Sequence, residues 1–246
     1  MNKQPIKKRL VKSKTLSMQV YDILCQSILK MKPNQNKLPS EEELARQLGV
    51  SRATIREALK LLSIKRAISS IHGRGTFAHP SVLKLKNRID QDNDFGQMIK
   101  QHYGNVQIDV AWNEEESADS LYDKWFPDML SVKLCLNYSA DQQKRLFTRY
   151  HFPRDFFTQP LPEQLKIASL PHLSHLYMAE DIDYCAMECR VKIDSEACEQ
   201  LDLPQGTPLM CWDEVIYDVG DRSVGTGEVF VHPENMVMTM VARLEY

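Results

Sequence analysis

Residues 51–62 read Ser-Arg-Ala-Thr-Ile-Arg-Glu-Ala-Leu-Lys-Leu-Leu, and this stretch predicts a helix with two different faces. Ser51 is a residue type that caps helices, because its hydroxyl accepts a hydrogen bond from a free amide of the first turn. Apolar residues with helical spacing give one buried face: Ile55, Ala58, Leu59 and Leu62. Basic residues recur every four positions on another side: Arg52, Arg56 and Lys60. A basic helix face is often merely solvated, so this pattern alone leaves nucleic-acid binding as one of two interpretations.

The residues just before this helix predict a second, shorter helix and a tight turn. Ser40 and Glu43 have the spacing of a capping box, and the acidic residues between them suit the positive end of a helix dipole. Gly49 stands where helices commonly end in a left-handed residue. Two short helices joined by a glycine-containing turn are typical of a helix-turn-helix, whose second helix enters the major groove of DNA.

A hairpin is predicted directly after the two helices. Short β-prone runs occupy residues 67–71 and 76–78, and His72-Gly73-Arg74-Gly75 lies between them. Glycines in such a turn allow the tight reversal and leave Arg74 at the tip. A hairpin in this position is the wing of a winged helix.

Residues 38–78 resemble the winged helix of the GntR family of bacterial transcription regulators. The resemblance rests on LPSEEELARQLGVSRATIREALKLL and on the later HGRGTF. It implies DNA contacts from helix starts, the second helix and the wing, namely Ser40, Ser51, Arg52, Ala53, Thr54, Arg56, His72, Gly73, Arg74 and Gly75. Two residues depart from the family pattern. Glu42 replaces a common DNA-contacting arginine, which changes the expected operator sequence, and Arg66 replaces the glycine that ends the second helix.

Charge is divided unequally along the 246 residues. Residues 1–80 hold 16 Lys and Arg against 5 Asp and Glu, a balance of +11, whereas residues 81–246 hold 15 against 28, a balance of −13. A basic N-terminal part is the electrostatic signature of a nucleic-acid binder. The basic residues at 1–14 predict an arm that neutralises phosphates or, in the simpler interpretation, a solvated tail.

The sequence predicts an α+β protein with three parts: residues 1–80 as the DNA-binding domain with its basic arm, 81–92 as a linker, and 93–246 as a second domain. Alternating and helical patterns predict helices at 95–99, 117–126, 163–169, 173–178 and 195–201. Strands are predicted at 106–112, 130–138, 146–152, 186–193, 209–217, 223–231 and 237–244. Ser195 is expected to cap the helix at 195–201.

The second domain resembles the ligand-binding UTRA domain of the HutC subfamily. The resemblance rests mainly on residues 173–231, including Ala197-Cys-Glu-Gln-Leu-Asp-Leu-Pro-Gln-Gly-Thr-Pro-Leu209 and the hairpin that follows. It implies a chorismate-lyase-like fold, in which an antiparallel sheet with flanking helices forms a dimer and holds a small-molecule effector.

The usual anion clamp of such domains is missing from this sequence. An R-x-R pair is common in them, but Leu136 and Tyr138 occupy those positions, and Thr148 replaces a frequent glutamate. The loss argues against lyase activity and against sugar-phosphate effectors. Lys133, Arg145 and Arg149 remain as alternative cations. The polar candidates for effector binding are Tyr138, Thr148, Ser174, Tyr177, Glu228, His232 and Glu234.

Metal sites, cofactors and membrane spans are not expected. The six cysteines lack the spacing of a zinc site, and His172 and His175 have no partner ligands in sequence. No apolar stretch is long enough to span a bilayer, and no secretion signal is recognisable, so the cytoplasm is the expected compartment.

Together these patterns predict a homodimeric transcription regulator, a repressor without enzymatic activity, which binds a palindromic operator in double-stranded DNA and responds to a small-molecule effector. Two alternatives stay open. In the first, the second domain serves only dimerisation. In the other, it is a lyase-like enzyme domain.

Overall fold

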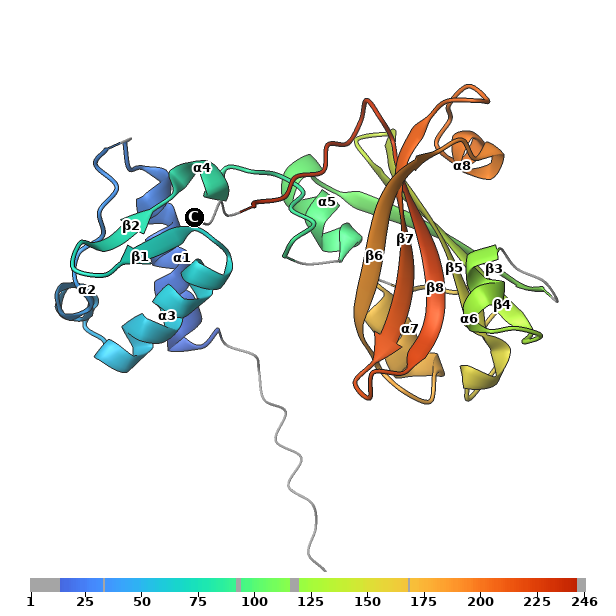
Figure 1. Cartoon of the computed structure of the whole chain (residues 1–246), viewed down its shortest axis with the longest axis horizontal. Helices are drawn as coiled ribbons and strands as arrows, with labels where there is room; N and C mark the ends of the chain where they lie inside the picture. The colour runs from blue at the N-terminus through green and yellow to red at the C-terminus, as the bar shows by residue number, and fades with distance from the viewer. Residues whose placement is uncertain (1–13, 33, 92–93, 116–119, 168, 243–246) are drawn as a thin grey trace, which may run out of the picture. The chain divides into compact units, whose positions relative to one another are not determined.

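A computed structural model describes residues 14–32, 34–91, 94–115, 120–167 and 169–242. The chain forms two compact units (Figure 1). Unit 1 contains the residues up to Leu85 together with Val241 and Ala242, and unit 2 contains Lys86–Met240. The predicted α+β class is confirmed, because a helical unit with a hairpin precedes a unit built on one antiparallel sheet.

Unit 1 is a three-helix core with a hairpin. Its elements are α1 (Leu16–Leu29), α2 (Glu41–Leu48), α3 (Arg52–Ile64), β1 (Ile68–Ile71), β2 (Gly75–Ala78) and α4 (Pro80–Leu83). The apolar faces of the three long helices meet in one core that includes Val20, Leu24, Ile28, Leu44, Ile55, Ala58 and Leu62. The helical spacing of these residues therefore decides how unit 1 packs.

The predicted helix ends of unit 1 are confirmed. The amide of Glu43 donates to Ser40 Oγ at 3.2 Å, and the amide of Ser40 donates to Glu43 Oε2 at 2.8 Å, which is the reciprocal capping box. Gly49 ends α2 in the left-handed region with φ 65°. Arg66 also has a left-handed backbone, with φ 57°, at the position where the family pattern has glycine.

Unit 2 is a six-stranded antiparallel sheet with the strand order β3-β4-β5-β8-β7-β6. The strands are β3 (Val106–Glu115), β4 (Ser131–Ala140), β5 (Gln143–Pro153), β6 (Ile182–Lys192), β7 (Leu209–Asp218) and β8 (Ser223–Val231). The helices are α5 (Phe95–Tyr103), α6 (Ser120–Trp125), η1 (Arg154–Phe156), α7 (Leu170–Tyr177) and α8 (Ser195–Gln200). In Figure 1, α5 and α7 cover one face of the sheet, and α6 and α8 lie on the other.

Three sequence predictions for unit 2 are wrong. Residues 163–167 form no helix, because Leu165 and Ile167 alternate with exposed Lys166 and enter the core from an extended segment. Asp194, not Ser195, caps α8, since Asp194 Oδ1 accepts from the amide of Ala197 at 2.8 Å. The strand expected at 237–244 is absent from its described part, residues 237–242, where only an isolated bridge at Thr239 forms.

The segment after β8 pairs with the chain that leaves unit 1. Ile89 donates its amide to the Thr239 carbonyl at 3.0 Å, and the Thr239 amide donates to the Asn87 carbonyl at 3.0 Å. Asn87 Nδ2 also donates to the Val237 carbonyl at 2.7 Å. Beyond this pairing, Val241 and Ala242 belong to unit 1, where they line a hollow with Ser63 and Arg66.

Candidate functional site

The start of α3 is fixed by two hydroxyls. The amide of Thr54 donates to Ser51 Oγ at 3.1 Å, and the hydroxyls of Ser51 and Thr54 lie 2.9 Å apart. Ile55 and Ala58 hold the helix against the core, and both are fully buried. The first turn of α3 is thereby held rigidly, with Ser51, Arg52 and Ala53 exposed.

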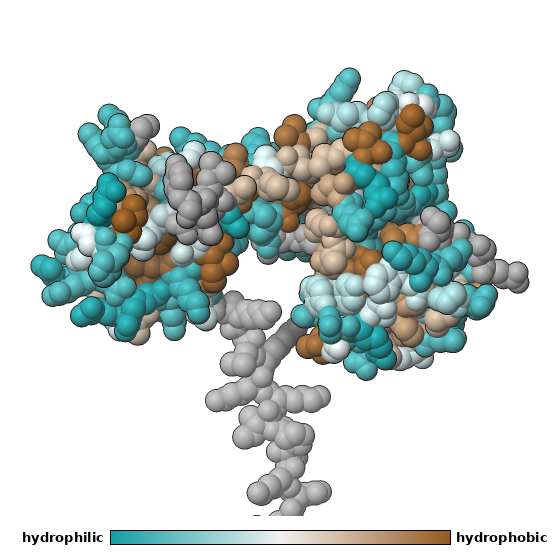
Figure 2. Space-filling model, viewed as in Figure 1, coloured by the Kyte–Doolittle hydropathy of each residue, from teal (hydrophilic) through white to brown (hydrophobic). Residues whose placement is uncertain are grey.

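The arginines of α3 project from the exposed side of the helix. Arg56 retains 66% of its side-chain exposure, and its Nε lies 3.9 Å from Glu41 Oε2, a long and solvent-screened ion pair. Ser40, at the start of α2, is also exposed. In Figure 2 the surface of unit 1 over α2 and α3 is largely hydrophilic. Such a surface can meet a phosphate backbone without losing an apolar contact.

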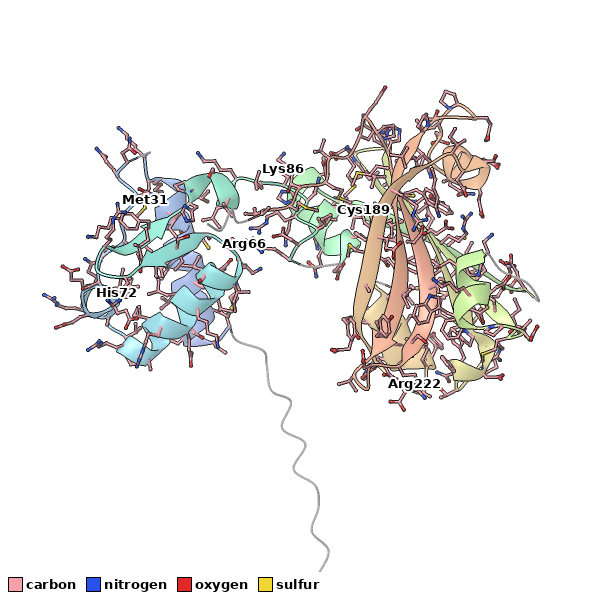
Figure 3. The ribbon with its side chains drawn as sticks, viewed as in Figure 1. Met31, Arg66, His72, Lys86, Cys189 and Arg222 are labelled. Carbon is pink, nitrogen blue, oxygen red and sulfur yellow. The ribbon has the colours of Figure 1, made fainter. Side chains whose placement is uncertain are left out.

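The wing is a tight hairpin with an exposed tip. Its strands pair in register from Ile68 with Ala78 to Ile71 with Gly75, and the amide of Arg74 donates to the Ile71 carbonyl at 3.0 Å. Gly73 has φ +71°, a left-handed conformation that glycine adopts without steric cost. His72, which Figure 3 labels at this hairpin, and Arg74 are both exposed.

A lysine that sequence patterns did not single out lies beside the wing. A Cβ at Gly75 would come within 2.9 Å of Lys37 Cε, and Lys37 forms an isolated bridge with Phe77. The pairing is supported by hydrogen bonds from the amides of Leu38 and Ala78 to the carbonyls of Thr76 and Asn36. No local pattern reveals this neighbour, because the pairing joins residues about forty positions apart.

The residues expected to bind an effector in unit 2 lie in separate places. Tyr138 and Thr148 are buried on the sheet face covered by α5 and α7. Ser174 is buried in α7, where its Oγ donates to the Pro171 carbonyl and accepts from the amide of Ile182, each at 3.1 Å. Tyr177, at the end of α7, is partly buried. Ser174 is thus already fully hydrogen-bonded within the fold.

The remaining three candidates lie elsewhere. Glu228 faces the opposite side of the sheet, opposite Arg149 in the β5–β8 pair. His232 follows β8, and its Nδ1 accepts from the amides of Glu234 and Asn235 at 3.2 and 3.1 Å. Burial lowers the pKa of His232, so its ring is held neutral in this turn. Glu234 is exposed. The structure therefore does not bring the seven candidates into one site.

The three alternative cations are each bound to other groups. Arg149 donates to Glu196 at 2.7 Å and to Asp194 at 2.9 Å, and it also pairs with Glu228. Lys133 Nζ donates to Glu196 at 3.2 Å. Arg145 donates to the Asn235 carbonyl, and its guanidinium lies 4.2 Å from the centre of the Tyr103 ring. These contacts hold α8 and the segment after β8 onto the sheet.

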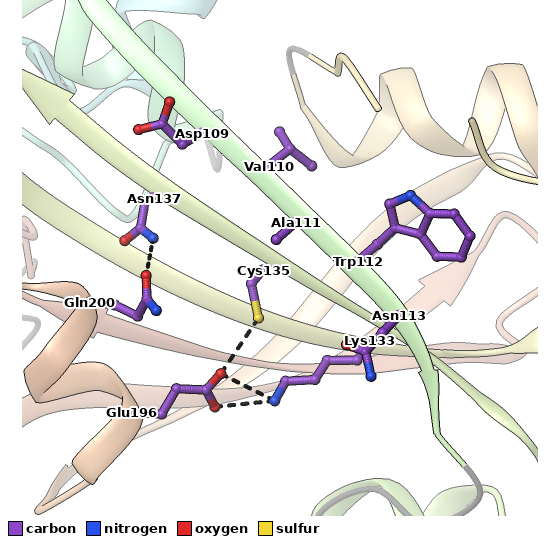
Figure 4. A pocket seen from close by; sticks show the side chains of 10 residues that line it. All are labelled: Asp109, Val110, Ala111, Trp112, Asn113, Lys133, Cys135, Asn137, Glu196 and Gln200. Atoms are coloured by element: carbon purple, nitrogen blue, oxygen red, sulfur yellow. Dashed lines mark hydrogen bonds and ion pairs between the residues drawn. The ribbon is translucent and has the colours of Figure 1, made fainter. Parts of the chain in front are cut away.

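A hollow lies between β3, β4 and α8 (Figure 4). Polar contacts between side chains of β4 and α8 cross it. Lys133 and Cys135 both contact Glu196, and Asn137 Nδ2 donates to Gln200 Oε1 at 2.5 Å. Burial raises the pKa of the Cys135 thiol to about 11, so this thiol is not a nucleophile near neutral pH. Lys133, Cys135 and Asn137 therefore anchor α8, and we assign these three a structural role.

A second hollow lies on the other face of the sheet, at the start of α7, and we call it the α7 cavity. Its volume is about 220 Å³, and its lining includes Asp94, Phe95, Tyr150, Asp183, Glu214 and Ile216. These residues come from α5, β5, β6 and β7. Burial raises the pKa of Glu214 to about 7, since the carboxylate would lose its hydration there. The α7 cavity thus contains a buried carboxyl group whose pKa lies near neutral pH.

Within the described ranges, no group of three or more His, Cys, Asp or Glu side chains is placed to hold a metal ion. Among the same residues, no helix is both long and apolar enough to cross a membrane.

Comparison with known families gives a match over the first unit. Residues 16–78 match the family described as bacterial regulatory proteins, gntR family. Over residues 16–78, unit 1 is therefore similar to a GntR-family domain. The match covers α1 through β2, so it includes the exposed start of α3 and the whole wing.

Curated relatives share the region of the GntR-family domain. A protein of Escherichia coli (strain K12), named as a proposed regulator of the L-lactate dehydrogenase operon, is 36% identical over 86 residues. The Shigella flexneri protein of the same name is equally similar. The alignment covers 31% of this chain and 33% of each relative, so the chain spans about a third of the length of the curated relatives that it matches.

Solved structures share the fold of both units. YydK, a proposed transcriptional regulator from Bacillus subtilis, is 19% identical, with a TM-score of 0.68 over 94% of this chain and 100% of that chain. PhnF from Mycobacterium smegmatis is 18% identical, with a TM-score of 0.52 over 92% of this chain and 100% of that chain. The ligand-binding domain of a proposed GntR-family regulator from Bordetella bronchiseptica is 16% identical, with a TM-score of 0.50 over 57% of this chain and 92% of that one. At these identities the likeness shows a shared fold and nothing further.

Proposed function

We propose that this protein is a transcription regulator that binds double-stranded DNA through unit 1 and a small-molecule effector through unit 2. In this proposal it acts as a homodimeric repressor in the cytoplasm, with unit 2 as a UTRA domain of the HutC subfamily. Each unit 1 occupies one half of a palindromic operator, as two-fold symmetric regulators do.

The observation that carries the proposal is the geometry of the GntR-family domain. The capped start of α3 leaves Arg52 and Arg56 exposed, and the exposed wing turn carries Arg74. Arginine in the first turns of a groove-binding helix can donate two hydrogen bonds to guanine. The positive balance of residues 1–80 supplies the attraction to phosphate that such binding requires.

A test uses the full-length protein and a pool of random duplex DNA. We expect repeated selection to enrich sequences with two inverted half-sites, and the bound complex to contain two protein chains. Affinity for the enriched sequence should fall steeply with salt, because counterions are released when cations contact phosphates. Failure to enrich any sequence would overturn operator binding, and a complex with one chain would overturn the dimer.

The effector proposal has its own test. The GntR-family domain and the effector site are on different units, so effector binding must change DNA affinity to count as regulation. Small molecules that raise the melting temperature of the protein should also change its affinity for the enriched duplex. A compound that is consumed in the assay would instead support an enzymatic unit 2.

A further inference from the structure

We propose that the α7 cavity binds a small organic cation, with an ammonium or guanidinium group attached to an apolar or aromatic body. The inference rests on the proposed function in taking unit 2 as the ligand-binding unit. It goes further by naming the chemical class of the ligand and the carboxylate that recognises it.

The charges around the cavity have one sign. Three carboxyl groups contribute to the lining, from Asp94, Asp183 and Glu214. None of the lining residues that the structure describes is Lys, Arg or His. Asp94 caps α5 by accepting from the amide of Gln97 at 2.9 Å, and Asp183 is exposed on β6. A ligand with a positive group would therefore meet attraction from every charged side chain of the lining.

Glu214 is a buried carboxyl group of the lining with one hydrogen-bond partner. Its exposed fraction is 2%, and Trp212 Nε1 donates to its Oε1 at 2.7 Å. Among the described residues, Glu214 makes no other hydrogen bond or ion pair. A buried carboxylate normally has a cation or several donors as partners, because burying an unpaired charge is costly. A bound ammonium group would supply the missing partner.

The rest of the lining suits the apolar part of such a ligand. Phe95 and Ile216 are buried core residues, and Phe95 packs at 5.9 Å from Trp212 between ring centres. Tyr150, also buried, contributes its ring from β5. Aromatic rings next to a carboxylate favour an organic cation, since the ring face attracts positive charge. A phosphate or carboxylate ligand would find no Lys, Arg or His side chain in the described lining, and the start of α7 would be its one source of partial positive charge among the features named here.

The test uses benzylamine, benzyl alcohol and benzoate, which share one ring and differ in the charge of one group. Calorimetry on the full-length protein at pH 8, with tryptophan fluorescence as a second measurement, gives the affinity for each. We expect benzylamine to bind about tenfold or more tightly than benzyl alcohol, as one charge-assisted hydrogen bond implies. Benzoate should bind more weakly than either. Tightest binding of benzoate, or no binding of benzylamine up to its solubility limit, would overturn the inference.

Two variants locate the binding group. Glu214→Gln removes the charge but keeps the shape and the acceptor for Trp212, so the preference for benzylamine should disappear. Asp183→Asn changes an exposed residue at the same cavity, where folding is little affected, and should weaken benzylamine binding by a smaller factor. The affinity of the parent for benzylamine should also rise as pH increases through about 7, while Glu214→Gln shows no such rise. An unchanged preference in folded Glu214→Gln would contradict the assignment.

The same samples separate this inference from the proposed function. If duplex DNA binds but benzylamine does not, the ligand class is wrong and the regulator proposal stands. If benzylamine binds but no DNA sequence is enriched, the cavity is assigned correctly and the regulator proposal fails.

A separate observation concerns the free edges of the sheet. We infer that two copies of the chain pair through β6, antiparallel, with Cys189 of one copy opposite Cys189 of the other. This specifies how the proposed homodimer forms and predicts which residues meet at its axis. The outer edge of β6 makes no strand pairing among the described residues, since β6 lies at the end of the sheet.

In this arrangement, charged residues of one β6 strand lie opposite residues of the other sign in the second copy. An antiparallel pair centred on Cys189 places Glu188 of one copy opposite Arg190 of the other, twice. Within the single chain Arg190 pairs with Glu188 at 2.8 Å, and both side chains retain exposure toward a second copy, 82% for Glu188 and 43% for Arg190. On the other side of the strand, Val191 would meet Met187 of the second copy. Val191 is 71% exposed in the single chain, next to Met210 at 41%.

The opposite edge of the sheet cannot pair with itself in this way. β3 carries Asp109, Glu114 and Glu115 and has no basic residue. Two antiparallel copies of β3 would place carboxylates near one another, which is unfavourable. Of the two free edges, β6 is therefore the one that a second copy fits.

Cys189 makes the pairing measurable. It is the exposed cysteine among the six, and Figure 3 labels it on β6. Directly opposed residues of an antiparallel pair have Cα atoms about 4.5–5.5 Å apart, within the range of a disulfide. Mild oxidation with diamide should convert the full-length protein into a disulfide-linked dimer, and Cys189→Ser should abolish the link. As a matched control, Ala111→Cys in the Cys189→Ser background places a thiol on β3 and should not cross-link.

Charge exchange gives an independent test by mass in solution. Glu188→Arg and Arg190→Glu should each weaken the dimer, because each places like charges opposite one another. The double variant restores the pairs in reverse and should recover dimerisation. A monomeric parent, a dimer that does not cross-link through Cys189, or a double variant no better than the single ones would overturn the inference.

Discussion

Arg149 on β5 and Glu228 on β8 stand directly opposite each other in the sheet, and Arg149 Nε donates to Glu228 Oε2 at 2.9 Å. Glu228 also accepts from Lys192 Nζ at 2.6 Å. With an exposed side-chain fraction of 6%, this carboxylate is enclosed by cations on the face of the sheet that carries α8. Its contacts are those of a structural ion pair and leave little access for a ligand.

Glu228→Gln should therefore destabilise the protein. Loss of the charge weakens the hydrogen bonds to Arg149 and Lys192 and leaves the guanidinium with two carboxylate partners. We expect the free energy of unfolding to fall by about 2 kcal/mol, the scale of a hydrogen bond to a charged group. Urea denaturation measures it. Glu234→Gln, an exposed control nearby, should change the value by less than about 0.5 kcal/mol.

Glu214→Gln should stabilise the protein at high pH only. The pKa of Glu214 is raised from 4.5 to about 7 in the folded state. The folded state therefore holds a proton that the unfolded chain has lost, and this contribution to stability decreases as pH rises from 4.5 to about 7. The variant should match the parent near pH 4.5 and exceed it by on the order of 3 kcal/mol above about pH 8. A difference between the two proteins that does not depend on pH would show that Glu214 does not titrate in this range.

Arg52→Ala and Arg56→Ala should each weaken binding to the selected DNA sequence by about 1–3 kcal/mol, as the loss of a good base contact does. Binding to unrelated duplex should change less. Lys30→Ala, which removes the same charge beyond the end of α1, serves as the control. Fluorescence anisotropy at one fixed salt concentration compares the variants. If all three lose the same affinity on both DNAs, α3 contributes only charge.

Arg66→Gly should stabilise unit 1 slightly. A residue with a Cβ in the left-handed region costs about 1 kcal/mol relative to glycine, partly offset by the greater chain entropy of glycine in the unfolded state. We expect a gain in the free energy of unfolding of no more than about 1 kcal/mol. A loss of stability would mean that the Arg66 side chain makes a contact worth more than its backbone strain.

Structural features that depend only on residues close together in the chain were predictable from the sequence. Ser40, Ser51 and Gly49 mark helix ends by their own chemistry, and the hairpin of β7 and β8 follows from two alternating runs around a short polar turn. The failures came from other causes. Leu165 and Ile167 are spaced two apart and fit an extended segment, but the residues around them also satisfied a weak helical pattern.

The location of sites in unit 2 was not predictable, because it depends on pairing between distant strands. Glu228 and Thr148 are both polar residues on strands, and only the register of β5 with β8 places them on opposite faces. The α7 cavity joins Asp94, Tyr150 and Glu214, which lie on three elements far apart in sequence. No spacing rule connects such residues before the sheet order is known.

The hydrogen bonds that join residues 87–89 to residues 237–239 have a consequence for the folding of a newly synthesised chain. The helices of unit 1 can form once residue 85 has left the ribosome, but their contacts with Val241 and Ala242 must await the synthesis of all of unit 2. Closing so long a loop in an unfolded chain carries an entropic cost. Once unit 2 has folded, the pairing of Asn87 with Thr239 holds its two ends together, so most of that loop is already closed. The contacts of unit 1 with Val241 and Ala242 are therefore expected to form last, after unit 2 has folded.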